Sequence, residues 1–428
     1  MEEQNPWWVN EEDFKYKKWE ESEIRWKPRI IEEITFNPFS LNFISGPRQV
    51  GKTTALKICI HELVKQKDPK AVFYYSCDEL TDHRELGEIL DNYISARRER
   101  KIKGSFIFLD EITFVEEWWR AIKFRIDNGF FRNDVLVVTG SCSLELLKQK
   151  EYFPGRRGYG KDIYFFPLNF SEYVEIFGGR ELKKISIDGL KGVESVIKAN
   201  SLYQTTINNL FGSYLKTGGF PVPIKEFFTK GKVSVYSKKV YLDWLKSDWK
   251  RIGKSDKYMK EVISYILRSR LSPISWLSIS RETSLASPHT TQSYVETLED
   301  LFVAKVLNII TPDSRILYRK NKKIHITDPF LYSTLAYFTG EEVLEEIIVE
   351  SVVASHLSRV TNVYFWKNKS EIDIIAEMNK EQIGIEVKWG FKKFRKPRHL
   401  SLLLLTKDRL PLFLASIEWS KNRKECLS

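Results

Sequence analysis

Cysteine is scarce in this chain of 428 residues, and none of its four cysteines forms a CxxC pair. Closely spaced cysteines are common ligands of structural zinc, so the sequence offers no zinc site of that kind. A chain of this length also needs no disulfide framework to hold a core. Cys59, Cys77, Cys142 and Cys426 are therefore expected to be small buried hydrophobic residues in a reducing compartment.

Long apolar runs are missing as well. The longer ones, such as residues 402–405, are far shorter than the roughly 20 apolar residues that a membrane-spanning helix requires. The first residues, MEEQN, contain neither the basic segment nor the apolar segment of a secretion signal. We expect a cytoplasmic protein without membrane contact.

Acidic residues are outnumbered, since 68 lysines and arginines against 57 acids give a formal charge of +11. A basic balance favours an anionic partner, nucleic acid before a membrane surface, although a lysine-rich surface that binds nothing gives the same balance. A hydrophobic content of 42% is ample for packed domains. This length exceeds a single core, so about two to four domains are expected.

Patterns along the chain predict five segments. Residues 1–30 are rich in tryptophan and charge and are expected to form a clasp on the next domain. In residues 31–180, strand-like runs alternate with helical patterns, which predicts a mainly parallel α/β sheet with helices on both faces. The strands of this sheet are expected at 41–45, 71–77, 105–109 and 134–139. The other segments are a helical lid or linker (181–255), a helical segment ending in two strands (256–340), and a helix followed by strands at 363–366, 372–376 and 383–387 (341–428).

A phosphate-binding loop follows the first predicted strand. Residues 46–53 read GPRQVGKT, and a helical run follows over 54–65. Glycines let the loop turn its N–H groups toward phosphates, and the helix adds its positive N-terminal end. Lys52 is expected to reach the β- and γ-phosphates and Thr53 to bind Mg²⁺. The residues predicted to hold ATP are Gly46, Pro47, Arg48, Gln49, Val50, Gly51, Lys52, Thr53 and Thr54.

An apolar strand ends in two carboxylates, Asp110 and Glu111, after the residues FIFL. Sheets of this class bind ligands at the carboxyl ends of their strands. Asp110 is expected to hold the Mg²⁺ shell, and Glu111 to orient or deprotonate the attacking water. Together with the loop, the pair predicts hydrolysis of ATP.

Two further positions complete the predicted site. Ser141 follows the strand VLVVTG and is either a hydrogen-bond donor to the γ-phosphate or water, or an ordinary turn serine. Arg156 and Arg157 follow Gly155, and a guanidinium can neutralise the charge that develops on a transferred phosphoryl group. Either arginine is a candidate finger across an interface in a homo-oligomer, or is merely solvated.

These motifs together resemble the AAA-type ATPases widespread in archaea and some bacteria. The runs NPWW at 5–8 and RWKPR at 25–29 are similar to the same group. The resemblance extends in patches over nearly the whole chain and is most specific at the phosphate loop. It implies a P-loop AAA-type parallel sheet domain, an α+β winged helix in 256–340 and a small α/β endonuclease-like domain in 341–428.

The winged helix is expected to contain helices at 274–282 and 287–301, with Ser287 as N-cap and Pro288 in the first turn. Residues 316–326 are expected to form a hairpin. In a DNA-binding module the second helix would enter the major groove and the basic wing would contact phosphates. Acids at Glu296 and Glu299 suit DNA poorly, so a packing role stays open. The basic tip of the wing, within 319–323, comprises Arg319, Lys320, Lys322 and Lys323.

The C-terminal segment resembles the PD-(D/E)xK nucleases in the order of its charged residues. Asp373 and Glu386 are the expected metal ligands, Glu350 an accessory acid, and Lys388 the group that orients water or stabilises charge. The departure is Ile372, where many nucleases have proline. The basic run at 392–398 follows and is expected to grip a phosphate backbone.

These patterns predict Mg²⁺-dependent ATP binding and hydrolysis that drives a conformational change coupled to DNA binding or processing, with nuclease activity left open. The alternative is a signalling or defence switch whose C-terminal modules bind protein partners. A metabolic kinase is a weaker third hypothesis, because it leaves the C-terminal half unexplained.

Overall fold

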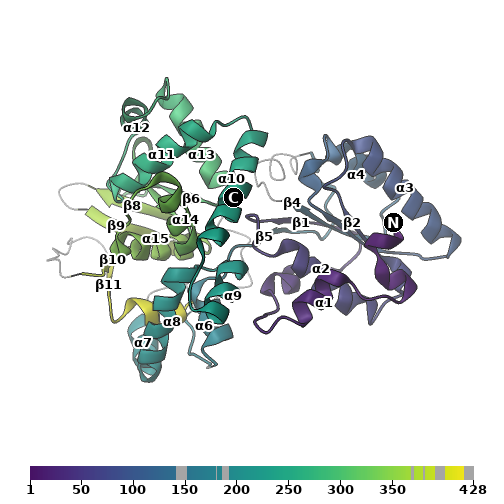
Figure 1. The fold of residues 1–428 in the computed structure, drawn as a ribbon, viewed down its shortest axis with the longest axis horizontal. Coiled ribbons are helices and arrows are strands. Elements are labelled where there is room, and N and C mark those ends of the chain that lie inside the picture. Colours follow the sequence, from purple (N-terminus) through teal and green to yellow (C-terminus); the bar gives the residue numbers. More distant parts are fainter. Residues whose placement is uncertain are drawn as a thin grey trace. The chain divides into compact units, whose positions relative to one another are not determined.

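The computed structural model describes residues 1–140, 152–179, 181–185, 192–367, 371–378, 381–390 and 401–418. The chain divides into two compact units, which we call the N-terminal unit (Met1–Phe166) and the C-terminal unit (Pro167–Ser428). Figure 1 shows the ribbon of both. The two units meet between residues 166 and 167, ahead of the border that the sequence pattern predicted at 180. The border predicted at 340 falls within the C-terminal unit.

The N-terminal unit is built on a parallel sheet with the strand order β2-β3-β4-β1-β5. The predicted mainly parallel α/β fold is confirmed. Strand β4 lies between β1 and β3, so the strands that lead into the phosphate loop and into Asp110 are not direct neighbours. The short β5 was not predicted, because so few residues show no alternation. The strands are β1 (Ser40–Ser45), β2 (Val72–Ser76), β3 (Phe106–Asp110), β4 (Val135–Gly140) and β5 (Asp162–Tyr164).

Helices cover both faces of this sheet (Figure 1). Helices α1 (Phe14–Glu20) and α2 (Lys52–Val64) pack on one face, and α3 (His83–Glu99) and α4 (Trp118–Asp127) pack on the other. Successive strand residues therefore enter different cores: Phe43 packs with α3 and α4, and Ile44 with α1 and α2.

The N-terminal residues cover the free edge of β2. An edge strand exposes unpaired backbone groups, which proteins commonly cover. The indole N–H groups of Trp7 and Trp8 both donate to the Val72 carbonyl at 2.9 Å. The Asn5 side chain donates to the Tyr74 carbonyl at 2.9 Å and accepts from the Tyr74 amide at 2.7 Å. The tryptophan-rich start of the chain thus completes the sheet with side-chain groups.

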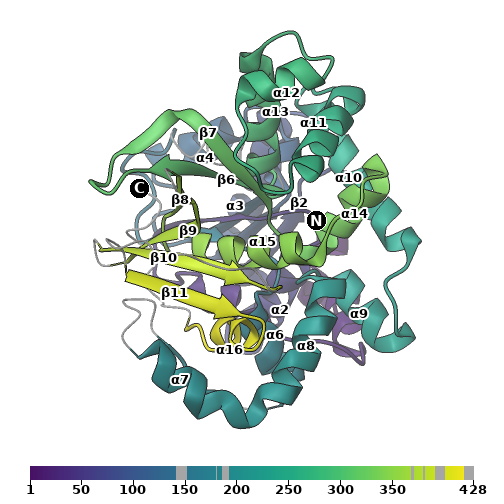
Figure 2. The same ribbon diagram turned by 90° about the vertical axis from the view of Figure 1, so that its left-hand side faces the viewer.

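The C-terminal unit contains a mixed sheet in the order β11-β10-β9-β8-β6-β7 (Figure 2). The three strands predicted near the C-terminus are present as β8, β9 and β10. Strands β6 and β7, expected to belong to a winged helix, are part of this same sheet, since β6 aligns with β8 at Ile309 and Phe365. The strands are β6 (Ala304–Ile310), β7 (Ile316–Ile326), β8 (Val363–Lys367), β9 (Glu371–Met378), β10 (Glu381–Lys388) and β11 (Ser401–Thr406).

Helices surround this sheet, and α15 packs against β7, β8 and β9. The two helices predicted within 274–301 are present as α12 and α13, and the Ser287 hydroxyl accepts from the Thr290 amide as the predicted N-cap. No helix in the parts of the chain that the structure describes is both long and apolar enough to cross a membrane. The helices are α6 (Phe170–Phe177), α7 (Val193–Asn200), α8 (Gln204–Thr217), α9 (Pro221–Lys230), α10 (Val235–Arg251), α11 (Asp256–Ser269), α12 (Trp276–Glu282), α13 (Pro288–Asp300), α14 (Pro329–Thr339), α15 (Glu345–Ser358) and α16 (Leu410–Ala415).

The prediction of a basic hairpin tip within 319–323 was wrong. The hairpin joins β6 to β7, and its turn lies at 311–315. The register shifts at this point, because Asn308 aligns with Lys322 and the next residue aligns with Leu317. Residues 318–321 therefore bulge outward, which leaves Arg319 and Lys320 exposed but buries Lys322 and Lys323 within the strand.

Candidate nucleotide site and acidic cluster

The phosphate loop connects β1 to α2 and depends on glycine at two positions. Gly51 has φ of 104° immediately before α2 begins at Lys52, a conformation that glycine adopts at little cost. A Cβ on Gly46 would lie 2.2 Å from the carbonyl oxygen of Phe165, so no larger residue fits there. The tight loop thus delivers the N-terminus of α2 to the carboxyl end of the sheet, where anions bind.

The predicted phosphate-binding lysine is folded into this loop. The Lys52 ammonium donates to the carbonyl oxygens of Gly46 at 2.9 Å and Pro47 at 3.1 Å, and its side chain is buried. Arg48 lies over the ring of Phe114, with its guanidinium carbon 5.4 Å from the ring centre. The structure therefore places Lys52 at the loop, as its predicted role requires.

Asp110 lies at the end of β3 and receives hydrogen bonds from three hydroxyl groups. The hydroxyls of Thr53 and Tyr74 donate to Oδ2 at 2.6 and 3.0 Å, and that of Thr139 donates to Oδ1. Asp110 is only 1% exposed. The two predicted magnesium ligands, Thr53 and Asp110, are thus in direct contact. Carboxylate and hydroxyl oxygens are donors that suit Mg²⁺, so these residues fit the ion.

Glu111 follows in a strained conformation, with φ of 53° and ψ of 39°. A residue with a side chain is uncommon in this region, and such strain often occurs at functional sites. The Glu111 amide donates to the Thr139 hydroxyl at 3.0 Å. Its Oε2 atom is buried and has no hydrogen-bond partner in the described part of the chain. An unsatisfied carboxylate oxygen beside Asp110 is suited to accept from a water molecule.

The other predicted residues of this site are only partly placed. Ser141 lies outside the described residues. Arg156 binds Asp127 at 2.6 Å, and Arg157 binds both oxygens of Asp162 at 3.0 and 2.8 Å. Both arginines are thus paired within the N-terminal unit. The Arg156–Asp127 pair is partly exposed, and such pairs contribute only about 0–1 kcal/mol, whereas the two parallel bonds between Arg157 and Asp162 hold that guanidinium more firmly.

A second cluster of charges lies in the C-terminal unit, and Lys323 is at its centre. Its ammonium lies 3.2 Å from Glu350, 2.9 Å from Glu371 and 3.6 Å from Asp373. The side chain is only 2% exposed. Burial lowers the pKa of Lys323, but the three carboxylates outweigh it and the net shift is upward. Lys323 therefore stays charged and offsets part of the negative charge of the cluster.

The predicted nuclease-like residues Asp373, Glu386 and Lys388 come close to one another on the neighbouring strands β9 and β10. Lys388 binds Glu386, and Asp373 accepts from the Val387 amide at 3.0 Å. Burial raises the pKa of Glu386, and the nearby Asp373 charge raises it further. Burial also raises the pKa of Glu350 to about 7, against the opposing effect of Lys323.

A metal ion does not fit this cluster as it stands. In the described residues, no group of three histidine, cysteine or acidic side chains is arranged to hold one. The Lys323 ammonium lies among Glu350, Glu371 and Asp373 instead. The basic run predicted at 392–398 lies outside the described residues. Metal binding by Glu350, Asp373 and Glu386 therefore stays a prediction.

Three family models match this chain. Residues 39–174 match the family model described as an AAA domain. Residues 208–342 match a domain of unknown function, and residues 308–400 match a family described as archaea bacterial proteins of unknown function. The phosphate loop, Asp110 and Glu111 all lie within the residues that match the AAA domain model.

Individual relatives are distant. An uncharacterized protein of Methanocaldococcus jannaschii is 28% identical over 228 residues, which cover 50% of this chain and 44% of that protein. The match thus spans less than half of the relative. A Walker-type ATPase of Pyrococcus abyssi is similar in structure at 14% identity and a TM-score of 0.43, covering 69% of this chain and 90% of that chain. The Aeropyrum pernix ORC1 protein, solved in complex with DNA, is similar at 14% identity and a TM-score of 0.33, covering 70% of this chain and 86% of that chain.

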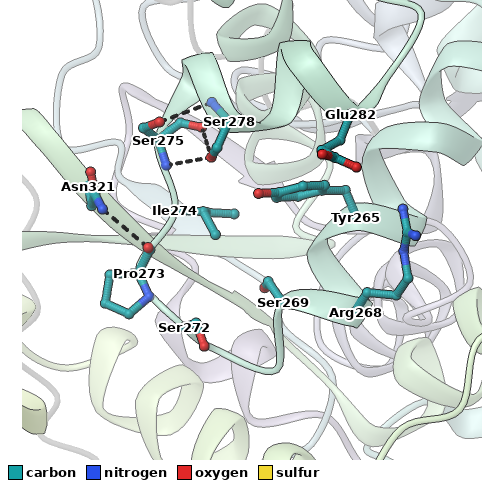
Figure 3. Close-up of a pocket in the computed structure, with 10 residues that line it drawn as sticks. All are labelled: Tyr265, Arg268, Ser269, Ser272, Pro273, Ile274, Ser275, Ser278, Glu282 and Asn321. Atoms are coloured by element: carbon teal, nitrogen blue, oxygen red, sulfur yellow. Dashed lines mark hydrogen bonds between the residues drawn. The ribbon is translucent and has the colours of Figure 1, made fainter.

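A polar pocket of about 510 Å³ lies between α11, α12 and the bulge of β7 (Figure 3). Its lining includes Tyr265, Arg268, Glu282 and Asn321. Most of its serines are already engaged: Ser275 and Ser278, for example, bind each other as the cap of α12. None of the predicted site residues lines this pocket.

Sequence reasoning missed three residues that complete these sites. Thr139 and Tyr74 bind Asp110 from neighbouring strands, and Lys323 was assigned to an exposed wing. A polar threonine at the end of an apolar strand was an available signal for Thr139, because the ends of parallel strands meet at one edge. Nothing local marks Tyr74 or Lys323, whose roles depend on distant residues.

Proposed function

We propose that this protein is a Mg²⁺-dependent ATPase, and that ATP turnover in the AAA domain drives conformational changes coupled to DNA binding. The observation that carries the proposal is the buried Asp110 carboxylate, which binds the Thr53 hydroxyl directly beside the phosphate loop. The two side chains belong to different elements, β3 and α2, and meet at one point.

The residues of the nucleotide site would have separate roles in hydrolysis. Lys52 and the loop amides would bind the phosphates, and Thr53 and Asp110 would hold Mg²⁺, which when bound neutralises charge on the phosphate oxygens. Glu111 would orient the attacking water and accept its proton through the free Oε2 atom. Ser141 and one of Arg156 and Arg157 are proposed to contact the γ-phosphate, the arginine from a second copy of the chain.

DNA is the proposed anionic partner, and the cytoplasm the proposed location. The net charge of +11 supports this, as do Arg319 and Lys320, which are exposed on the bulge beside the exposed Tyr318. Lysine and arginine contact phosphates, and an aromatic ring can stack on an unpaired base. The basic run at 392–398 would add further phosphate contacts.

A second function is favoured by one observation. Because Lys323 already pairs with three of the acids, the nuclease-like cluster is suited to hold β7, β9 and α15 together rather than to cleave DNA. In this alternative the chain is an ATP-dependent signalling or defence switch whose C-terminal unit binds protein partners.

The test measures steady-state ATP hydrolysis of the full chain and of the variants Lys52→Ala and Glu111→Gln. We expect Lys52→Ala to lose ATP binding, and Glu111→Gln to bind ATP but hydrolyse it at least about 100-fold more slowly, as loss of a general base requires. Arg98→Ala is the control, because it removes an exposed arginine over the ring of Phe130 in the same unit and outside the predicted site, and it should leave hydrolysis unchanged. Unchanged hydrolysis in both test variants would refute the ATPase proposal.

DNA binding and cleavage are measured separately. Labelled single-stranded and double-stranded DNA is titrated at several salt concentrations, because affinity through phosphate contacts falls steeply with salt. We expect Arg319→Ala with Lys320→Ala to weaken binding and flatten the salt dependence. Salt-independent or absent DNA binding, with ATP hydrolysis intact, would leave the switch as the better function. Cleavage that Asp373→Ala abolishes would instead assign the acidic cluster a catalytic role.

A further inference from the structure

Tyr74 lies between the N-terminal segment and the proposed magnesium ligand. Its hydroxyl donates to Asp110 Oδ2 at 3.0 Å, and its backbone amide and carbonyl both bind the side chain of Asn5. Tyr74 and Asn5 are both buried. Burial raises the pKa of Tyr74 well above its ordinary value, and the Asp110 charge raises it further, so the hydroxyl keeps its proton. A single residue thus joins the first turn of the chain to the AAA site.

A second connection reaches the same ring through Lys57 of α2. The Lys57 ammonium lies 3.2 Å from the centre of the Tyr74 ring and 2.9 Å from Asp13 Oδ2. It also lies 5.2 Å from the centre of the Trp7 ring. The buried lysine is therefore held by one carboxylate and two aromatic faces, an arrangement that stabilises a desolvated cation. Asp13 and Trp7 both come from the N-terminal segment.

Asp13 has two roles that fix its position. Its Oδ1 atom caps α1 by accepting from the amides of Lys15 and Tyr16, while Oδ2 pairs with Lys57. Helix α1 packs against α2, the helix that begins at Lys52 and Thr53 (Figure 1). The segment from Asn5 to Asp13 is therefore anchored to α2, which carries Thr53, and to β2, whose Tyr74 binds Asp110.

We propose that residues 5–13 contribute to the ATP site by positioning the Asp110 carboxylate for Mg²⁺ through Tyr74. The inference rests on the proposed ATPase function. Asp110 Oδ2 accepts from both Thr53 and Tyr74. If Thr53 turns its hydroxyl to the metal, Tyr74 is the residue that continues to hold this oxygen. Tyr74 is thus a positioning residue, and Asn5, Trp7, Asp13 and Lys57 hold it in place.

The test is the variant Tyr74→Phe in the full chain, which removes the hydroxyl and keeps the ring. Binding of a fluorescent ATP analogue is titrated in EDTA and then at increasing Mg²⁺ concentrations. Loss of a group that orients a metal ligand typically costs 10–100-fold in metal affinity. We expect binding in EDTA to stay within about twofold of wild type, while the Mg²⁺ concentration for half of the metal-dependent effect rises at least about 10-fold.

Two further variants separate positioning from general damage. Tyr93→Phe is the matched control, because Tyr93 is likewise a buried tyrosine of the same unit. Its ring stacks on Phe73, and its hydroxyl donates to the Lys70 carbonyl instead of to Asp110. It should leave the Mg²⁺ dependence unchanged. Asp13→Asn keeps a good helix cap but removes the charge beside Lys57, and it should also raise the Mg²⁺ requirement. Asp13→Asn thereby tests the segment itself even if Tyr74→Phe folds poorly.

The outcomes separate this inference from the function on which it rests. A normal Mg²⁺ dependence in both Tyr74→Phe and Asp13→Asn, with ATP binding lost in Lys52→Ala, would overturn the inference and leave the ATPase standing. An equal shift in Tyr93→Phe would also overturn it, because the effect would then be general destabilisation. If Lys52→Ala binds the analogue as wild type does, the proposed ATP site is itself refuted.

Discussion

The buried charge of Lys323 allows a quantitative prediction for the C-terminal unit. The substitution Lys323→Met keeps most of the side-chain volume but leaves Glu350, Glu371 and Asp373 without the ammonium that lies 2.9–3.6 Å from each. Removing one partner of a buried ion pair costs about 3–5 kcal/mol. Glu371 and Asp373 are partly exposed and can regain water, so we expect the lower end, about 3 kcal/mol.

The assay is hydrogen exchange of the full chain, followed in peptides from β7, β9 and α15. Peptide-level exchange is preferable because a chain of two units need not unfold in one step. Lys367→Met is the matched control: it removes a lysine 3.1 Å from the same Glu371, but Lys367 is 47% exposed, so the loss should stay below about 1 kcal/mol. Glu350→Gln added to Lys323→Met should recover part of the loss. Equal effects of the two lysine variants would refute the view that burial gives Lys323 its importance.

Two more predictions concern pH and the phosphate loop. Burial raises the pKa of Glu350 from 4.5 to about 7, so the folded state binds this proton more tightly than the unfolded state. The stability of β7 and α15 should therefore fall as the pH rises from about 4.5 to about 7. Glu350→Gln should flatten that slope, measured by hydrogen exchange corrected for the intrinsic rate. Gly46→Ala should distort the loop by roughly 1–3 kcal/mol and weaken ATP binding, because its Cβ meets a backbone carbonyl. Gly212→Ala on α8, where nothing lies within 4 Å of a Cβ, should leave ATP binding unchanged and stabilise the helix slightly. An ATP affinity that Gly46→Ala does not lower, or a wild-type slope that Glu350→Gln preserves, would contradict the respective argument.

The N-terminal unit was predictable because its signals are local. The phosphate loop is a contiguous run of residues, and the strands β1, β3 and β4 are buried on both faces over nearly their whole length, so they are mostly apolar and easy to recognise. The loop and the end of β3 had only to lie at the same edge of the sheet. Tyr74 was not predictable in the same way, because its role depends on β2 lying beside β3 and on Asn5 reaching its backbone.

The C-terminal unit shows where patterns fail. The run from Lys322 to Ile326 alternates charge and isoleucine, which is typical of a strand with one face in water. In the structure α15 covers the face that carries Lys323 and His325, and His325 lies beside Ser351 of this helix at 3.1 Å. The sequence of a strand does not indicate whether a helix later in the chain will cover its polar face. The carboxylates Glu350, Asp373 and Glu386 were identified as a cluster, but Glu371 and the buried lysine among these acids were not.

The partners of the two acidic sites explain why we place Mg²⁺ at one of them and not at the other. Asp110 is bound by the neutral hydroxyls of Thr53, Tyr74 and Thr139, which orient the carboxylate without cancelling its charge. In the C-terminal cluster the bonds come from ammonium groups, so a divalent cation would have to displace Lys323 from a buried position. The displaced Lys323 ammonium and the divalent cation would then repel each other. The raised pKa of Lys323 also makes it unfavourable for the lysine to lose its proton instead. Hydroxyl donors thus leave Asp110 ready for a cation, whereas the C-terminal acids already hold one.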